Sequence, residues 1–184
     1  MNETSNQLVT VPARENWFSR FQVVALIVLT LIAIIGKFYL PRFVANMEWL
    51  ELPLLLTVYF GLMRRNQIAS LLFGAFVGLA EDSLSPANLP VGMYGITKTL
   101  VGYFATSVSM RFNVESPVIR LVLSFFFYLF HAFFYWIMRR ALLGQTIPFD
   151  AREALVHGAL NAVVAIPLFA VLDRMKLAGP HERI

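Results

Sequence analysis

The chain has 184 residues, of which 58% are hydrophobic and only 14% are charged, and its mean hydropathy is +0.67. A soluble domain would be roughly half apolar and about a quarter charged. This composition therefore excludes an ordinary water-exposed surface and indicates an integral membrane protein. The net charge of +4 argues for no nucleic-acid partner, because the basic residues lie between the apolar runs and form no patch. The absence of cysteine excludes disulfides, thiolate metal sites and cysteine nucleophiles.

Six apolar runs are candidates for membrane helices, each of which needs about 20 apolar residues. The expected spans are residues 21–40, 50–63, 66–80, 91–110, 118–138 and 154–172. The sequence thus predicts an all-α integral membrane protein with a six-helix transmembrane domain at 20–174, between cytoplasmic tails at 1–19 and 175–184. The second and third runs are short, so their charged ends snorkel or the pair forms a tight hairpin deep in the bundle. Lys37 is expected to snorkel at the end of the first run.

Orientation is predicted from the lysines and arginines between the spans, since these residues favour the cytoplasmic side. With the N-terminus inside, the cytoplasmic segments hold nine basic residues and the outer loops hold five. The nine are Arg14, Arg20, Arg64, Arg65, Arg111, Arg120, Arg174, Lys176 and Arg183. The five are Lys37, Arg42, Arg139, Arg140 and Arg152. Both termini are therefore expected in the cytoplasm, and the loop at 81–90 is expected outside.

A row of small residues in the third span leads into a carboxylate. Its members are Ser70, Gly74, Gly78 and Asp82. Steps of four residues place them on one side of a helix. Such a stripe lets a second helix approach closely, which is how many membrane helices associate. We interpret the stripe as a helix-packing or partner interface that ends in the acidic pair Glu81 and Asp82, at or near the membrane boundary.

The fourth span contains a second seam of small residues, with one lysine set into it. The seam comprises Gly95, Lys98, Gly102, Ala105 and Ser109. An unpaired ammonium at the bilayer centre costs about 2.5 to 3.5 kcal/mol on insertion scales. Lys98 is therefore expected to pair with Glu81 or Asp82, as an internal ion pair that fixes the turn between spans three and four. The alternative is that Lys98 forms a ligand or proton site.

A polar stripe runs along the fifth span and continues in the sixth. It consists of Ser124, Tyr128, His131 and Tyr135, followed by His157 and Asn161. Two histidines with tyrosines allow a metal site or a proton relay. The plainer interpretation is hydrogen bonding between helices, because a zinc site needs three or four closely spaced ligands. We therefore expect no metal and no cofactor here.

Recognisable enzyme signatures are missing from the sequence. It contains no Gly-x-Ser-x-Gly elbow, no His-Glu-x-x-His, no Walker loop and no dinucleotide-binding fingerprint. We therefore predict no catalytic residues and no enzymatic activity.

Residues 73–103, FGAFVGLAEDSLSPANLPVGMYGITKTLVGY, resemble the central signature of the rod shape-determining protein MreD family. The matching positions are Gly74, Gly78, Asp82, Gly92, Gly102 and Tyr103. The number of spans and the small size also agree with the family. Glu81, which doubles the acidic site, and Lys98 depart from its pattern.

The resemblance implies a non-enzymatic scaffold subunit of the bacterial cell elongation (rod) complex in the cytoplasmic (inner) membrane. Expected partners are the lipid bilayer, the bitopic protein MreC, the MreB filament, and the glycosyltransferase–transpeptidase pair of RodA and its penicillin-binding protein. The family fold is similar to the membrane substrate-binding subunits of energy-coupling-factor transporters. That similarity implies the alternative function, a small-molecule (vitamin) binding subunit, with the loop 83–90 and the region around His131 as sources of polar groups.

Overall fold

The structure is a computed structural model that describes residues 20–43, 47–85 and 90–177. Helices make up this part of the chain, and it contains no strand. The elements are α1 (Arg20–Tyr39), the short 3-10 helix η1 (Leu40–Arg42), α2 (Leu52–Met63), α3 (Gln67–Leu84), α4 (Met93–Ser109), α5 (Pro117–Leu143) and α6 (Ala151–Leu177). The all-α expectation is confirmed for the described residues.

Local chemistry explains several of the helix ends. The side chain of Asn66 accepts a hydrogen bond from the backbone N–H of Ala69 at 3.0 Å and so caps the start of α3. Pro53 and Pro117 lie in the first turns of α2 and α5. Backbone N–H groups there have no partner within the helix, so proline loses no helical hydrogen bond. Gly144 ends α5 in the left-handed region, with φ of 60°.

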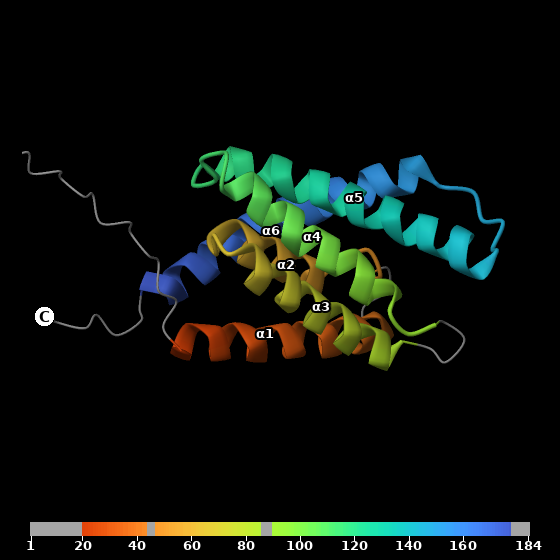
Figure 1. Cartoon of the computed structure of the whole chain (residues 1–184), viewed down its shortest axis with the longest axis horizontal. Helices are drawn as coiled ribbons and strands as arrows, with labels where there is room; N and C mark the ends of the chain where they lie inside the picture. The colour runs from red at the N-terminus through yellow and green to blue at the C-terminus, as the bar shows by residue number, and fades with distance from the viewer. Residues whose placement is uncertain (1–19, 44–46, 86–89, 178–184) are drawn as a thin grey trace, which may run out of the picture.

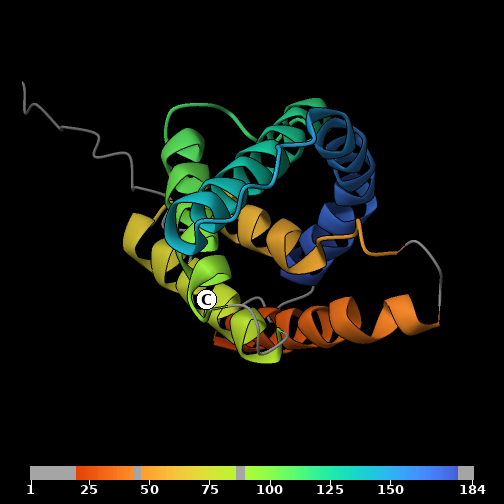
Figure 2. The ribbon, with the colours of Figure 1, turned by 90° about the vertical axis from the view of Figure 1, so that its right-hand side faces the viewer.

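The helices form a bundle in which α1 and α5 lie on opposite faces (Figure 1). Viewed from one end, α5 and α6 lie side by side, and α3 lies against α4 (Figure 2). Ten of the twelve residues of α2 are buried. Because α2 contacts five of the other helices and is apolar all round, it serves as the core around which the longer helices pack.

Four helices are long and apolar enough to cross a membrane: α1, α3, α5 and α6. Large apolar side chains on them are exposed to the surroundings, including Val24, Ile32, Leu72 and Val163, as a lipid-facing surface requires. The twelve residues of α2 extend only about 18 Å, against a hydrocarbon core of about 30 Å. The described helices are therefore compatible with a multi-pass membrane protein, with four candidate spans rather than the expected six.

Two helices end later than expected. The third helix continues to Leu84, so Glu81 and Asp82 lie within α3 and not in the loop after it. The sixth helix continues to Leu177, so the first residues of the expected tail at 175–184 are helical. Apolarity alone set the expected ends, and it could not show that polar pairing inside the protein extends a helix. The expected tail at 1–19 lies outside the described residues.

The stripe of small residues in α3 packs against α4. A Cβ atom added to Gly74 would lie 2.2 Å from the carbonyl oxygen of Lys98, and one added to Gly78 would lie 2.3 Å from that of Tyr94. From the opposite helix, a Cβ on Gly102 would lie 2.3 Å from the carbonyl oxygen of Ser70. Only glycine permits such a close approach of two backbones. The stripe is therefore a contact surface within the chain.

We predict that Gly78→Ala destabilises the protein by about 1 to 3 kcal/mol, because the new methyl group would overlap the α4 backbone. Gly36 in α1 is the matched control, since a Cβ there meets no atom within 4 Å. Gly36→Ala is expected to leave stability at or slightly above that of the unmodified protein. Unfolding in mixed micelles measures both variants, and equal stability of the two would refute the close contact.

Candidate functional site: a buried charge cluster beside a polar cavity

Four charged side chains meet at one end of the bundle. Lys37 comes from the last turn of α1, Glu51 immediately precedes α2, Glu81 lies near the end of α3, and Lys98 lies in the second turn of α4. We call these four residues the charge cluster. Two ammonium groups face two carboxylates, so the formal charge of the cluster is zero.

Each ammonium group of the charge cluster contacts both carboxylates. Lys37 Nζ lies 2.5 Å from Glu51 Oε1 and is also paired with Glu81. Lys98 Nζ lies 2.5 Å from Glu81 Oε2 and 3.9 Å from Glu51 Oε2. The side chains of Lys98 and Glu81 are wholly buried, and those of Lys37 and Glu51 are 13% exposed. Charges so far from water persist only when they are paired, so the four groups depend on one another.

The ring of Tyr94 lies against both ammonium groups of the charge cluster. Its ring centroid lies 4.6 Å from Lys37 Nζ and 4.6 Å from Lys98 Nζ. The negative face of an aromatic ring attracts a cation, more strongly where water is excluded. The ring also stacks on Tyr135 of α5, with centroids 4.7 Å apart. Tyr94 thereby connects the charge cluster to the polar stripe of α5.

The structure places Lys98 against Glu81, and it gives Asp82 a different role. The Asp82 carboxylate accepts backbone hydrogen bonds from Gly92 at 2.9 Å, Tyr94 at 3.1 Å and Gly95 at 2.9 Å. These N–H groups lie at the start of α4 and have no partner within the helix. A carboxylate there also interacts favourably with the helix dipole. Asp82 therefore fixes the start of α4 relative to α3, one turn before Lys98.

Two members of the charge cluster were missed by the sequence analysis. Lys37 does not snorkel as expected, because its ammonium turns inward to Glu51 and Glu81. Glu51 was counted as part of an apolar run, although a carboxylate inside an expected span was a signal that it needs a partner. The backbone N–H of Glu51 donates to Asn161 Oδ1 at 2.9 Å, and Asn161 Nδ2 donates to the carbonyl of Trp49 at 2.6 Å. Asn161 thereby holds the start of α2 against α6.

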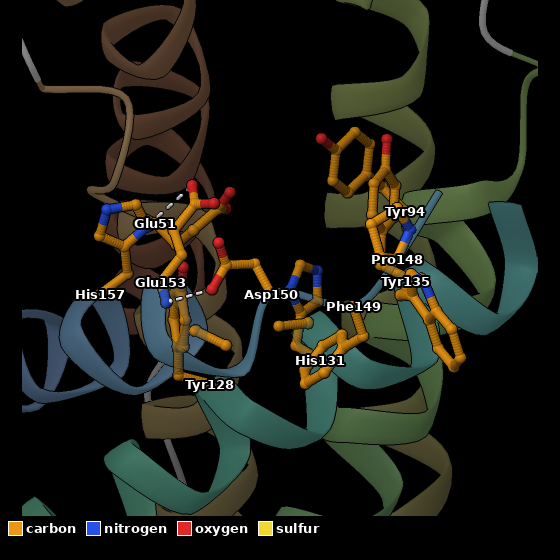
Figure 3. Close-up of a pocket in the computed structure, with 13 residues that line it drawn as sticks. Glu51, Tyr94, Tyr128, His131, Tyr135, Pro148, Phe149, Asp150, Glu153 and His157 are labelled. Carbon is orange, nitrogen blue, oxygen red and sulfur yellow. Dashed lines mark hydrogen bonds and ion pairs between the residues drawn. The ribbon is translucent and has the colours of Figure 1, made fainter. Parts of the chain in front are cut away.

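A cavity of about 280 Å³ adjoins the charge cluster, between α4, α5, α6 and the segment that leads into α6 (Figure 3). Four members of the predicted polar stripe line it: Tyr128, His131, Tyr135 and His157. Glu51 also lines it, so the cavity and the charge cluster share a side chain. Ser124 and Asn161 are buried elsewhere in the bundle. The stripe is therefore divided between a cavity wall and helix contacts.

The remaining predicted residues have structural positions in α4. Gly92 adopts φ of 108° before the helix begins, a conformation that other residues rarely take. Gly95 and Gly102 are buried against α3. Tyr103 is 38% exposed and lies in the second half of α4, beyond Lys98. Of the predicted set, Lys98 and Glu81 meet in the charge cluster, whereas Tyr103 lies apart from it.

A second polar network lies at the opposite end of the bundle. Arg120, at the start of α5, pairs with Asp173 near the end of α6. Tyr59 of α2 donates to Asp173 at 2.9 Å, and Arg120 Nε donates to the carbonyl of Val114 at 2.8 Å. Polar pairs therefore connect the helices at both ends, while the middle of the bundle is largely apolar.

The described residues contain no group of three or more histidine, aspartate or glutamate side chains arranged to hold a metal ion. The arrangement can neutralise buried charge, and the cavity can enclose a small molecule. The fold and site thus define a helical protein with four helices long and apolar enough to cross a membrane, a neutral buried charge cluster and an adjoining polar cavity. Comparison with protein-family models, curated proteins and solved structures finds no match for the chain.

We predict that Lys98→Met destabilises the protein by about 3 to 5 kcal/mol, because it leaves buried carboxylate charge without a partner. Combining it with Glu81→Gln should recover part of that loss, giving a coupling of about 1 kcal/mol or more in a double-mutant cycle. Unfolding in mixed micelles supplies the four free energies.

Asp82→Asn provides the matched control, since Asp82 bonds to the backbone of α4 and not to the ammonium. Its effect should add to that of Lys98→Met. Additive effects at Glu81 as well would contradict the charge cluster.

Proposed function

We propose that the chain is an MreD-like scaffold subunit of the bacterial rod complex in the cytoplasmic membrane. The observation that carries the proposal is the signature segment 73–103, whose described residues form a closely packed α3–α4 hairpin. Gly74, Gly78 and Gly102 permit the close approach, and Asp82 caps α4. The residues that carry the resemblance are thus the ones on which this hairpin depends.

The proposal includes six membrane segments with both termini in the cytoplasm. The six helices occupy the six expected runs, and the bias of nine basic residues to five supports the orientation. In this topology α2 lies within the bundle, supported by the longer helices around it. The charge cluster and the cavity then lie toward the outer face of the membrane.

A scaffold needs surfaces that remain free after its own helices have packed. The small-residue stripe is occupied by α4, so the surface for an MreC-like single-span partner lies elsewhere. α5 presents exposed aromatic side chains, including Phe126 and Phe133, of which 52% and 44% are exposed. In our proposal the partner helix packs against such an apolar face. MreB and the pair of RodA with its penicillin-binding protein join through the assembled complex.

The cavity favours a second candidate function, a vitamin-binding subunit of an energy-coupling-factor transporter. It is an open cavity lined by aromatic rings together with polar groups, and small-molecule sites also combine the two. The two candidates differ in their partners: an ATPase module for the transporter subunit, and cell-wall proteins for the scaffold.

We predict that reporter fusions at Ile184 and within the loop between α3 and α4 report opposite sides of the membrane. An even number of spans returns the C-terminus to the cytoplasm, while the α3–α4 loop follows the third span. Paired phosphatase and fluorescent-protein fusions measure this. Reports from the same side would refute the six-span topology.

We further predict that the protein co-purifies with a single-span MreC-like partner from its native membrane, and that its depletion makes rod-shaped cells round. Mild-detergent purification and microscopy measure the two effects. The transporter function predicts a bound vitamin, an associated ATPase module and normal cell shape. That second pattern would refute the scaffold proposal.

A further inference from the structure

We propose that the cavity between α4, α5 and α6 binds a small organic cation, namely a protonated amine on a soluble molecule or a lipid headgroup. This site goes beyond the scaffold function and does not depend on it, because it rests on the charge and shape of the cavity alone. Three properties of the lining point to this ligand class: its charge, its aromatic rings and its unpartnered polar atoms.

The charge of the lining is negative. Three carboxylates line it, Glu51, Asp150 and Glu153. The lining residues themselves include no lysine or arginine, and the nearby Lys37 and Lys98 lie behind Glu51 and Tyr94. The two lysines of the charge cluster compensate Glu51 and Glu81. Asp150 and Glu153 remain in excess, on the segment that enters α6. Carboxylates around a cleft concentrate cations and repel anions.

Aromatic rings form much of the wall. Tyr94, Tyr128, Tyr135, Trp136 and Phe149 all line the cavity. Rings of this kind bind ammonium groups through their negative faces, and groups of several such rings recognise organic amines. The Tyr94 ring already receives two lysine ammonium groups at 4.6 Å. One ring of this wall thus already lies against ammonium groups, and the rings of Tyr128, Tyr135, Trp136 and Phe149 can receive another.

Two polar atoms at the cavity have no hydrogen-bond partner among the described residues. One is Nε2 of His131, whose residue is only 4% exposed. The other is Glu51 Oε2, which has an ion-pair contact with Lys98 Nζ at 3.9 Å that is too long for a hydrogen bond. Buried polar atoms are normally satisfied, so an unpartnered one needs an explanation. Both belong to side chains that line the cavity, and Figure 3 shows Glu51 and His131 among the labelled side chains around it. An amine N–H can donate to either atom, because the carboxylate oxygen and a neutral imidazole nitrogen are acceptors.

The size of the cavity limits the ligand. A volume of about 280 Å³ lies just below the usual range for small-molecule sites, which begins at about 300 Å³. It accommodates one ring with a short amine-bearing chain, or a lipid headgroup whose acyl chains remain outside.

The first experiment tests a soluble amine. Calorimetric titration of the purified protein in micelles uses 2-phenylethylamine as the probe and 2-phenylethanol as its uncharged counterpart. We expect the amine to bind and the alcohol to bind at least about tenfold more weakly, because charge-assisted hydrogen bonds exceed about 1.4 kcal/mol. Bound amine should also raise the unfolding temperature.

Variants assign the binding to the cavity. Glu153→Gln removes an exposed carboxylate, and Asp150→Asn removes charge while keeping an oxygen that can accept from the N–H of Glu153. His131→Phe removes the unpartnered nitrogen and keeps a ring. Each should weaken binding by about fivefold to tenfold. Glu115→Gln, an exposed carboxylate in the α4–α5 loop at the other end of the bundle, is the control and should change nothing.

The second experiment tests a lipid source of the amine. The protein is placed in nanodiscs of phosphatidylglycerol with or without phosphatidylethanolamine, and lipids retained after ejection are identified by native mass spectrometry. Retention of phosphatidylethanolamine that is lost in Glu153→Gln and His131→Phe identifies the headgroup as the ligand.

Binding of the amine in the first experiment, with no retained lipid in the second, identifies a soluble ligand. The proposal is refuted if neither probe binds, if the alcohol binds as tightly as the amine, or if Glu115→Gln weakens binding as much as the cavity variants. None of these results affects co-purification with an MreC-like partner, so failure of this site is distinguishable from failure of the scaffold function.

Discussion

The structure depends on the neutralisation of four charges inside a low-dielectric interior. The charge cluster joins α1, α3 and α4 to the residue that precedes α2, and each ammonium group is shared by two carboxylates. A single misplaced member would leave an ion unpaired where water cannot reach it, at a cost of several kcal/mol. The four segments must therefore take relative positions that keep all four charges paired. This requirement favours one packing arrangement over others that bury a similar apolar area.

The close contact of α3 and α4 brings the charged groups near enough to pair. Glycines on both helices bring the backbones together, and Asp82 fixes the start of α4 through three backbone hydrogen bonds. With the two helices so fixed, Lys98 faces Glu81 one turn beyond. The segment 73–103, on which the proposed scaffold function rests, thus sets up the charge cluster through Glu81 and Lys98. The Glu51 carboxylate then extends the cluster to the cavity wall, which also contains the carboxylates of Asp150 and Glu153.

Local sequence patterns predicted much of this arrangement. Apolar runs placed all six helices, and spacing of four residues identified the Ser70–Gly74–Gly78 contact surface, because helical periodicity is a local property. Lys98 was expected to have an acidic partner, but sequence distance could not distinguish Glu81 from Asp82, which point to different parts of α4. Lys37 and Glu51 were missed, since their partners come from distant helices. The polar stripe around His131 was expected to supply polar groups to a site, but Glu51, Tyr94 and the segment before α6 could not be added to it, because they come from other parts of the chain.

The most direct test of the charge cluster is solid-state NMR of the protein in lipid bilayers, with ¹⁵N in the lysine ammonium groups and ¹³C in the glutamate carboxyl groups. The chain has only three lysines, so the spectrum is simple to assign with Lys98→Met as reference. The account predicts that the Lys37 and Lys98 nitrogens both show strong dipolar contacts to glutamate carboxyl carbons. These contacts should persist in high salt, because buried pairs are little screened. If either Lys37 or Lys98 shows no contact with a glutamate carboxyl carbon, the account is contradicted.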